Sequence, residues 1–151
     1  MNYIGIDPGR SGGAAIIDSA GAIIDVAKFK PMTLRDMADL FEEWATYPGT
    51  KAIIEKVHSM PKQGVSSTFK FGENFGMLQM ALAAYHIEFD YVTPQKWQGF
   101  MNCRSGGDKN VTKARAQGRW PHYKITHANA DCLLIADYCR TYQAEIVVDT
   151  G

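Results

Sequence analysis

Three acidic residues stand at positions where a buried core would otherwise need apolar side chains or a turn. Asp7 closes an apolar run near the N-terminus, Glu55 lies near the end of a second apolar run, and Asp131 stands among the apolar residues of a helical segment. Three carboxylates that meet repel one another and therefore need a cation. Oxygen ligands select hard ions such as Mg²⁺ or Mn²⁺, and two such ions, about 3.5–4 Å apart, can direct water at a phosphodiester.

The residues after Asp7 leave a second interpretation open. Pro8 and Gly9 end the apolar run at once, and Gly12 and Gly13 complete a flexible turn. A strand-end carboxylate before such a turn suits a metal ion, but a glycine-rich turn also suits a nucleotide phosphate. Taken singly, each of the three acids could also be a helix cap or a solvated side chain.

Hydrophobic periodicity predicts five strands and four helices. The strands are expected at 2–7, 13–18, 22–29, 51–57 and 87–92, and the helices at 33–46, 69–85, 111–118 and 127–142. Short turns make the first three strands antiparallel, whereas the fourth and fifth strands follow helices and can run parallel to the first. The prediction is an α/β fold with a mixed five-stranded sheet, helices on both faces, and a single domain over residues 1–151.

This arrangement would bring the three acids together. If the first and fourth strands are adjacent and parallel, Asp7 and Glu55 leave the sheet at the same edge. A last helix packed at that edge would carry Asp131 to them. The joint placement favours a carboxylate cluster that binds metal over three separate caps.

Although the net charge is zero, basic and acidic residues are unevenly distributed along the chain. Residues 92–124 contain seven basic residues and one acidic residue, whereas residues 1–50 contain four basic and seven acidic ones. A basic segment beside an acidic body indicates a polyanion partner, unless the segment is only a solvated surface loop. The basic residues that we expect to follow a DNA backbone are Lys62, Lys70, Lys96, Arg104, Lys109, Lys113 and Arg115.

The composition points to neither a membrane nor an oxidising compartment. No apolar run approaches the length of a membrane span, and the N-terminus lacks the basic and apolar regions of a signal peptide. The three cysteines do not form an even framework and fit free thiols in a reducing compartment. We therefore expect no membrane partner and a cytoplasmic location.

Three motifs in order, IGIDPGRSGGAAIID, AIIEKV and HANADCLLIA, link the chain to a known family. In this order and spacing they resemble the RuvC-type Holliday-junction resolvases of the RNase H-like nuclease superfamily. The segment 56–82 is similar to phage-type members, for which the location would be the bacterial host cytoplasm. The resemblance covers nearly the whole chain and implies an RNase H-like fold. It implies that Asp7, Glu55 and Asp131 bind metal, with two Mg²⁺ or Mn²⁺ ions in each active site.

The resemblance also implies a fourth site residue, one turn before the last acid. Ala128, three residues before Asp131, cannot bind a metal ion. His127 is four residues before Asp131 and would share its face of the expected helix, so His127 is the predicted fourth residue. Asn129, with its neutral amide oxygen, is the alternative.

Further roles follow from the same resemblance. Lys96 and Lys113 lie where the family places lysines that contact DNA phosphate or the active site, and Lys113 is predicted to be catalytic. The loop after the second acid reaches the junction centre in the family, which makes Met60 or Phe69 a possible wedge between bases. Phe69 could instead belong to the core at a helix start. The segment 72–84 corresponds to the two-fold interface of a homodimer.

The predicted function is a structure-selective endodeoxyribonuclease. A homodimer would resolve four-way DNA junctions by paired, metal-dependent nicks that leave 5′-phosphate and 3′-hydroxyl ends. The alternatives are a related nuclease for flap or other branched DNA, a non-catalytic nucleic-acid-binding protein, and an actin- or sugar-kinase-like nucleotide-binding lobe. The binding protein leaves the three acids without a role, and a cleft between two kinase-like lobes needs a chain about twice as long.

Overall fold

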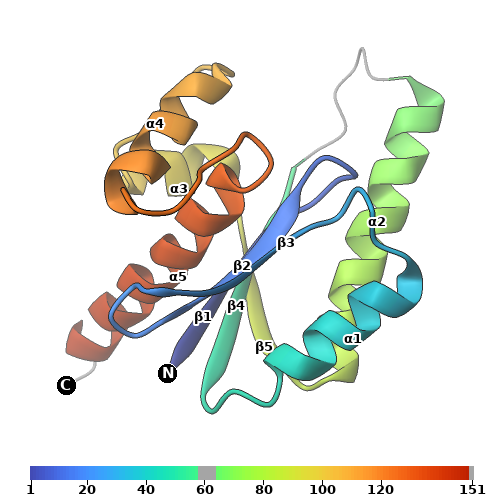
Figure 1. The fold of residues 1–151 in the computed structure, drawn as a ribbon, viewed down its shortest axis with the longest axis horizontal. Coiled ribbons are helices and arrows are strands. Elements are labelled where there is room, and N and C mark those ends of the chain that lie inside the picture. The colour runs from blue at the N-terminus through green and yellow to red at the C-terminus, as the bar shows by residue number, and fades with distance from the viewer. Residues whose placement is uncertain (58–63, 150–151) are drawn as a thin grey trace.

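A computed structural model describes residues 1–57 and 64–149 and shows a five-stranded sheet in that part of the chain (Figure 1). The strands are β1 (Asn2–Asp7), β2 (Gly13–Asp18), β3 (Ile23–Lys28), β4 (Thr50–Glu55) and β5 (Glu88–Val92), in the order β3-β2-β1-β4-β5. β2 pairs antiparallel with β1 and β3, whereas β4 pairs parallel with β1 and β5. The predicted mixed sheet is confirmed, with β1 at its centre.

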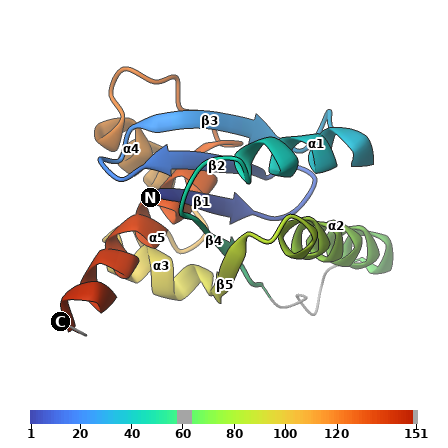
Figure 2. The same cartoon turned by 90° about the horizontal axis from the view of Figure 1, so that it is seen from below.

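Helices cover both faces of the sheet, as predicted (Figure 2). One face carries α1 (Leu34–Trp44) and α2 (Val65–Ala84). The other face carries α3 (Pro94–Phe100), α4 (Lys109–Arg119) and α5 (Ala130–Asp149). Each face has its own apolar core, and α5 runs directly over β1 and β2 in the second core.

The alternation of side chains along β1 divides its residues between the two cores. Ile4 and Ile6 point into the core under α1 and α2, so Tyr3, Gly5 and Asp7 point toward α5. Gly5 lets α5 approach the strand closely, because a Cβ atom there would lie 2.1 Å from the Ala136 nitrogen of the helix backbone. The absence of a side chain at residue 5 therefore sets the distance between β1 and α5.

Local signals place α1 where the sequence predicts it. The Thr33 hydroxyl accepts a hydrogen bond from the Asp36 backbone N–H, and the Asp36 carboxylate accepts one from the Thr33 N–H. These two bonds form a capping box, which fixes the first turn of the helix.

The structure corrects the starts of three predicted helices and adds one helix that was not predicted. α2 begins at Val65, so Phe69 lies within its second turn and is 70% exposed, which rules out the core alternative for Phe69. α3 was not predicted, and α4 begins two residues earlier than expected, where Asp108 caps it. α5 begins at Ala130, so His127 precedes the helix in a turn and does not share a helical face with Asp131.

The described helices include none that is both long and apolar enough to cross a membrane. Met60 and Lys62, the predicted wedge candidate and DNA contact in the loop after β4, lie outside the described residues.

Candidate active site

Asp7 and Glu55 end two adjacent parallel strands. Ile6 pairs with Ile54 in the β1–β4 register, and the two acids follow at the next position of each strand. Both acids therefore leave the same edge of the sheet on the face that α5 covers. The structure therefore has Asp7 and Glu55 at the same sheet edge, as the sequence predicts.

Glu55 is buried against α3. Only 8% of its surface is exposed, and the Trp97 indole N–H donates a hydrogen bond of 2.6 Å to its Oε2 atom. Burial is the main cause that raises the pKa of Glu55 to about 7; the indole hydrogen bond opposes this rise, and the Asp131 charge adds to it. Glu55 is therefore a carboxyl group that changes charge near neutral pH while Trp97 holds it in place.

Asp131 reaches the same region from the first turn of α5. Burial raises the pKa of its carboxyl group. A hydrogen bond with the Thr112 side chain and the positive charges of Lys109 and His127 act in the opposite direction. The carboxylate is thus partly buried between α4 and α5 and is approached by two basic side chains.

Of the three acids, Asp7 has the fewest neighbouring groups that stabilise its negative charge. Within the described part of the chain, its carboxylate receives no hydrogen bond and forms no ion pair. Burial and the charges of Glu55 and Asp131 raise its pKa well above the usual range, and only Lys109 lowers it. The three carboxyl groups therefore repel one another, which is the electrostatic condition for recruiting a cation.

A small hollow of about 260 Å³ opens at these residues. Asp7 and Asp131 line it together with His127, Lys109 and the β1–β2 turn, residues 8–12. Glu55 does not line this hollow and is buried. As the side chains stand, no three or more His, Cys, Asp or Glu residues in the described chain are arranged to hold a metal ion.

His127 and Asn129 occupy different environments. His127 is exposed on the wall of the small hollow. Asn129 is 7% exposed, and its amide oxygen accepts a hydrogen bond from the Thr126 N–H while its amide N–H donates one to the Lys124 carbonyl. The Asn129 amide therefore stabilises the turn before α5, which leaves His127 as the side chain facing the hollow.

Among the lysines, the structure brings Lys109 rather than Lys113 to the wall of the hollow. Lys109 is the first residue of α4, while Lys113 lies one turn later and is half-buried. The Lys96 ammonium lies 5.5 Å from the centre of the Tyr142 ring, and the Arg115 guanidinium donates to the Met101 carbonyl. Arg104 and Lys70 are exposed on the surface.

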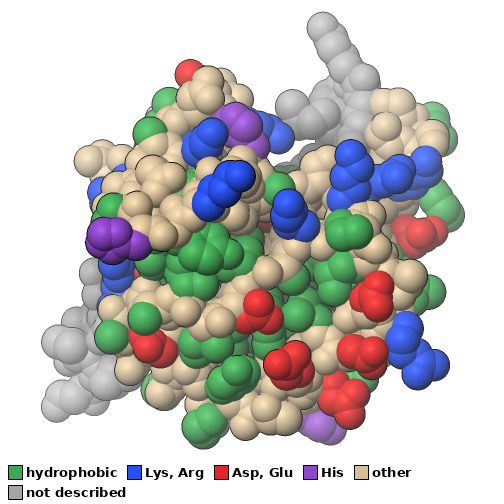
Figure 3. Space-filling view, in the orientation of Figure 1, with side chains coloured by type: hydrophobic (Ala, Val, Ile, Leu, Met, Phe, Trp, Pro, Cys, Tyr) green, Lys and Arg blue, Asp and Glu red, His purple; other side chains and the backbone are tan. Residues whose placement is uncertain are grey.

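The charges visible in Figure 3 form two regions. Lys, Arg and His side chains gather over α4 and the first part of α2, on either side of the edge that carries Asp7 and Glu55. Most acidic side chains on the same view lie toward α1. Basic side chains thus lie near the hollow, whose own lining combines two acids with Arg10, Lys109 and His127.

Sequence reasoning missed four supporting residues. Trp97 and Thr112 bind the acids, Arg10 lines the small hollow, and the Asn74 side chain accepts a hydrogen bond of 2.7 Å from the Gly9 N–H. The signal for Trp97 was present in Thr93 and Pro94, a helix cap followed by proline at the first helical position. The Asn74 contact joins residues 65 positions apart, which no local pattern marks.

The sheet order, the parallel β1–β4 pair and the helices on both faces define an RNase H-like fold. Two solved structures of RuvC from T. thermophilus share this fold. One, in complex with a Holliday junction substrate, has a TM-score of 0.69 and 16% identity, and the match covers 97% of this chain and 96% of that chain. The other has a TM-score of 0.63 and 16% identity, with 97% of each chain covered. The chain therefore has the RuvC fold over nearly its whole length, as predicted.

Sequence comparisons give no further assignment. No family model matches the chain, and no curated protein does either.

Proposed function

We propose that this protein is a structure-selective endodeoxyribonuclease that cuts four-way DNA junctions. The observation that carries the proposal is that β1, β4 and α5 bring Asp7, Glu55 and Asp131 toward one edge of the sheet, beside basic side chains and on the RuvC fold. A solved RuvC with this fold was determined with a Holliday junction substrate. The proposal places the activity in the cytoplasm, of a bacterium or of its host cell for a phage-encoded chain.

The donor set fits a hard divalent cation. Asp7 is a half-buried acid without a hydrogen-bond donor in the described chain; the charges of Glu55 and Asp131 raise its pKa, and the charge of Asp131 also raises the pKa of Glu55. Carboxylate oxygens are the ligands that Mg²⁺ and Mn²⁺ prefer. Asp7, Glu55 and Asp131 would hold the metal, one or two ions in each site, with His127 as the fourth residue.

The proposed reaction is hydrolysis of a phosphodiester bond. A divalent cation at such a site supplies activation of water and neutralisation of charge on the phosphate. Water oxygen forms a bond to phosphorus and the bond from phosphorus to the 3′-oxygen breaks, which leaves 5′-phosphate and 3′-hydroxyl ends. Lys109, on the wall of the small hollow, would stabilise the charge that develops on the phosphate, in the role first assigned to Lys113.

The proposal is tested with Asp7→Asn on a synthetic four-way junction in Mg²⁺ or Mn²⁺. We expect cleavage to fall by at least about a thousand-fold, because removal of one charged ligand disables metal-assisted hydrolysis. Junction binding should survive, because the basic surface is unchanged. Cleavage by the variant at the rate of the unaltered protein would contradict the proposal.

A homodimer is part of the proposal, with α2 as the interface. Only Leu78 and Leu82 of this 20-residue helix are fully buried, while Phe69 and Met80 are 70% and 68% exposed. Gly72 and Gly76 lie one turn apart on α2 with open space around them, so a second helix could approach closely. A two-fold dimer would present two active sites to two strands of a junction.

The second candidate is a nuclease of the same fold for flap or other branched DNA, since the site chemistry is the same. Cleavage of four-way, Y-shaped and linear duplex DNA on one gel distinguishes the two. The kinase-like lobe is less supported, because the match to RuvC spans both chains almost completely and requires no second lobe. A non-catalytic binding protein leaves the repelling carboxylates without a role.

A further inference from the structure

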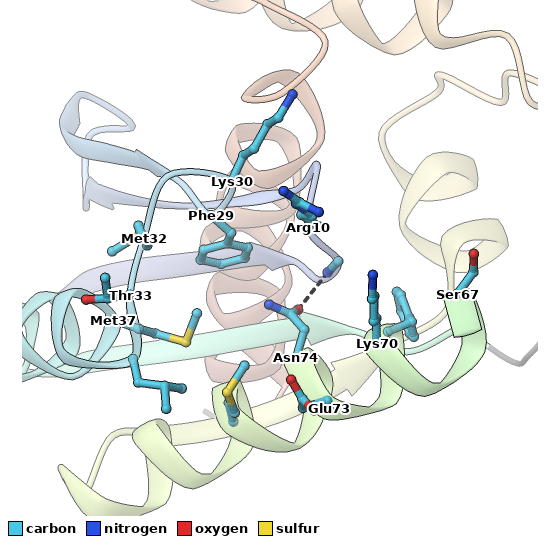
Figure 4. A pocket seen from close by; sticks show the side chains of 14 residues that line it. Arg10, Phe29, Lys30, Met32, Thr33, Met37, Ser67, Lys70, Glu73 and Asn74 are labelled. Atoms are coloured by element: carbon cyan, nitrogen blue, oxygen red, sulfur yellow. Dashed lines mark hydrogen bonds between the residues drawn. The ribbon is translucent and has the colours of Figure 1, made fainter. Parts of the chain in front are cut away.

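A larger hollow of about 970 Å³ opens beside the small one, between the β1–β2 turn, the β3–α1 connection and α2 (Figure 4). Its size lies at the upper end of the range for small-molecule sites, which is about 300–1,000 Å³. Nothing in the proposed cleavage reaction requires this hollow, so its lining needs a separate explanation.

Three cationic side chains from three different segments stand around the hollow. Arg10 comes from the β1–β2 turn, Lys30 from the β3–α1 connection and Lys70 from α2, and all three are exposed. None forms an ion pair within the described chain, and Glu73 is the single acid in the lining. A hollow with this charge attracts a phosphate group.

The rest of the lining is largely apolar. Phe29 and Met37 are buried in its wall, and Phe71 and Met77 are half-buried beside them. In Figure 4 the Phe29 ring lies between the Met37 side chain and Arg10, and the charged end of Lys30 projects away from both apolar side chains. A bare phosphate would leave this apolar wall uncovered, whereas a nucleobase would pack against it.

The two hollows lie next to each other. Gly9 and Arg10 line both of them, and the Gly9 N–H donates its hydrogen bond to Asn74 in the wall of the larger one. A DNA strand with its scissile phosphate at Asp7 would therefore have neighbouring nucleotides close to the larger hollow.

We propose that the larger hollow binds one unpaired nucleotide of the branched DNA, with its phosphate at Arg10, Lys30 and Lys70 and its base against Phe71 and the apolar wall. The inference rests on the proposed function, because bases at a branch point are more easily unstacked than bases within a duplex. Such a site would make cleavage depend on the base next to the cut.

The first test measures junction affinity in Asp7→Asn protein, so that cleavage does not interfere. Lys30→Ala combined with Lys70→Ala should weaken binding and make the slope of log affinity against log salt shallower by about 2, as expected for two lost phosphate contacts. The matched control combines Arg35→Ala with Lys51→Ala, which removes the same charge outside both hollows. Equal affinities and slopes for the two double variants would overturn the nucleotide site.

The second test alters the DNA and needs no further change in the protein. Junctions with one abasic residue at each position next to the branch point are bound to Asp7→Asn protein. At one position we expect the affinity to fall about ten-fold, because stacking of the base is lost. Phe71→Ala should lower the affinity for the intact junction by a similar factor. For the junction with the abasic residue at that position, Phe71→Ala should cause no further loss of affinity. Full affinity for every abasic junction would overturn the proposal.

Experiments on the same DNA molecules distinguish an error in the nucleotide-site proposal from an error in the proposed nuclease function. Absence of cleavage by protein with Asp7 intact contradicts the proposed nuclease. Normal cleavage, together with unchanged binding by the Lys30 and Lys70 double variant, contradicts the nucleotide site alone.

Discussion

At the scale of single residues, Glu55 combines burial with one strong hydrogen bond from Trp97. Its pKa of about 7 lies above the ordinary 4.5, so the folded chain holds this proton more tightly than the unfolded chain does. The contribution to stability is therefore fully present below about pH 4.5 and is lost as the pH rises through 7. The raised pKa values of Asp7 and Asp131 act in the same direction.

We predict that the metal-free protein loses stability between pH 5 and pH 8. The Glu55 shift from 4.5 to about 7 corresponds to about 3 kcal/mol in the free energy of unfolding. Melting temperature measured in chelator at several pH values checks the slope, and Mg²⁺ or Mn²⁺ at pH 8 should restore stability. Glu55→Gln should flatten the slope. A variant that keeps the full pH slope would contradict this role of Glu55.

A second prediction concerns Trp97→Phe, which keeps an aromatic ring but removes the donor to Glu55. Because the indole hydrogen bond lowers the pKa of Glu55, its loss should raise that pKa further and reduce the ionised fraction at neutral pH. The pH midpoint of junction cleavage should move upward, while the maximal rate at high pH is largely kept. A uniform loss of rate at every pH would indicate misfolding instead, which circular dichroism would reveal.

The three acids could be recognised from the sequence because each interrupts an apolar pattern. The residues that contact these acids could not be recognised in this way. Trp97 and Thr112 read as ordinary core and helix residues, and only the packing of α3 and α4 against the sheet brings them to the acids. Asn129 was weighed as a ligand, yet its amide is engaged by the backbone of its own turn.

At the scale of elements, the contact between β1 and α5 determines how the carboxylates meet. Gly5 lies two residues before Asp7, and the Cys132 carbonyl and Ala136 nitrogen of α5 would lie 2.2 and 2.1 Å from a Cβ atom at residue 5. Asp131 is on the same helix, one residue before Cys132. Any displacement of α5 from β1 therefore moves Asp131 away from Asp7.

We predict that Gly5→Ala destabilises the protein by about 1–3 kcal/mol, because backbone atoms must shift to admit the methyl group. It should also abolish stabilisation by Mg²⁺ or Mn²⁺, since the acids separate. Thermal melting with and without metal measures both effects. Gly118→Ala is the matched control: it lies inside α4 with open space around it and should stabilise by about 0.5–1 kcal/mol. Normal stability and metal response of Gly5→Ala would contradict this account.

The sheet was predictable because its strands alternate with clear turns and helices, and the parallel direction of β4 and β5 followed from the crossovers. Helix starts were less predictable. α5 begins at Ala130 because Asn129 and Thr126 form a hydrogen-bonded turn before it, and the expected helical spacing from His127 to Asp131 is replaced by that turn. The two residues nevertheless line the same hollow, so they lie near each other although the expected helical spacing is wrong.

At the scale of the whole molecule, α2 lies on the opposite face of the sheet from α5 (Figure 2), and its Phe69 and Met80 side chains are exposed. A shallow groove between α1 and α2 is lined by Leu34, Met77, Met80 and other apolar residues. Exposed apolar side chains gathered in this way are typical of a protein–protein interface.

We predict that Met80→Glu disrupts the proposed dimer, because a charged side chain is costly to bury at an apolar contact. Light scattering after gel filtration should show the monomer mass for Met80→Glu and the dimer mass for Met80→Leu. Junction cleavage by the monomer should give single nicks in place of paired cuts. A Met80→Glu variant that remains a dimer would place the interface elsewhere.

The hydrogen bond between Gly9 and Asn74 has a consequence for how such a chain can evolve. It ties the turn that follows Asp7 to the helix proposed to form the interface, across 65 positions of sequence. Gly9 has a φ of 109°, which only glycine adopts readily, so residue 9 has little freedom to change. In related chains, we expect substitutions at residue 74 to be limited to side chains that accept a hydrogen bond. This limit should hold even where the rest of α2 contacts a different partner.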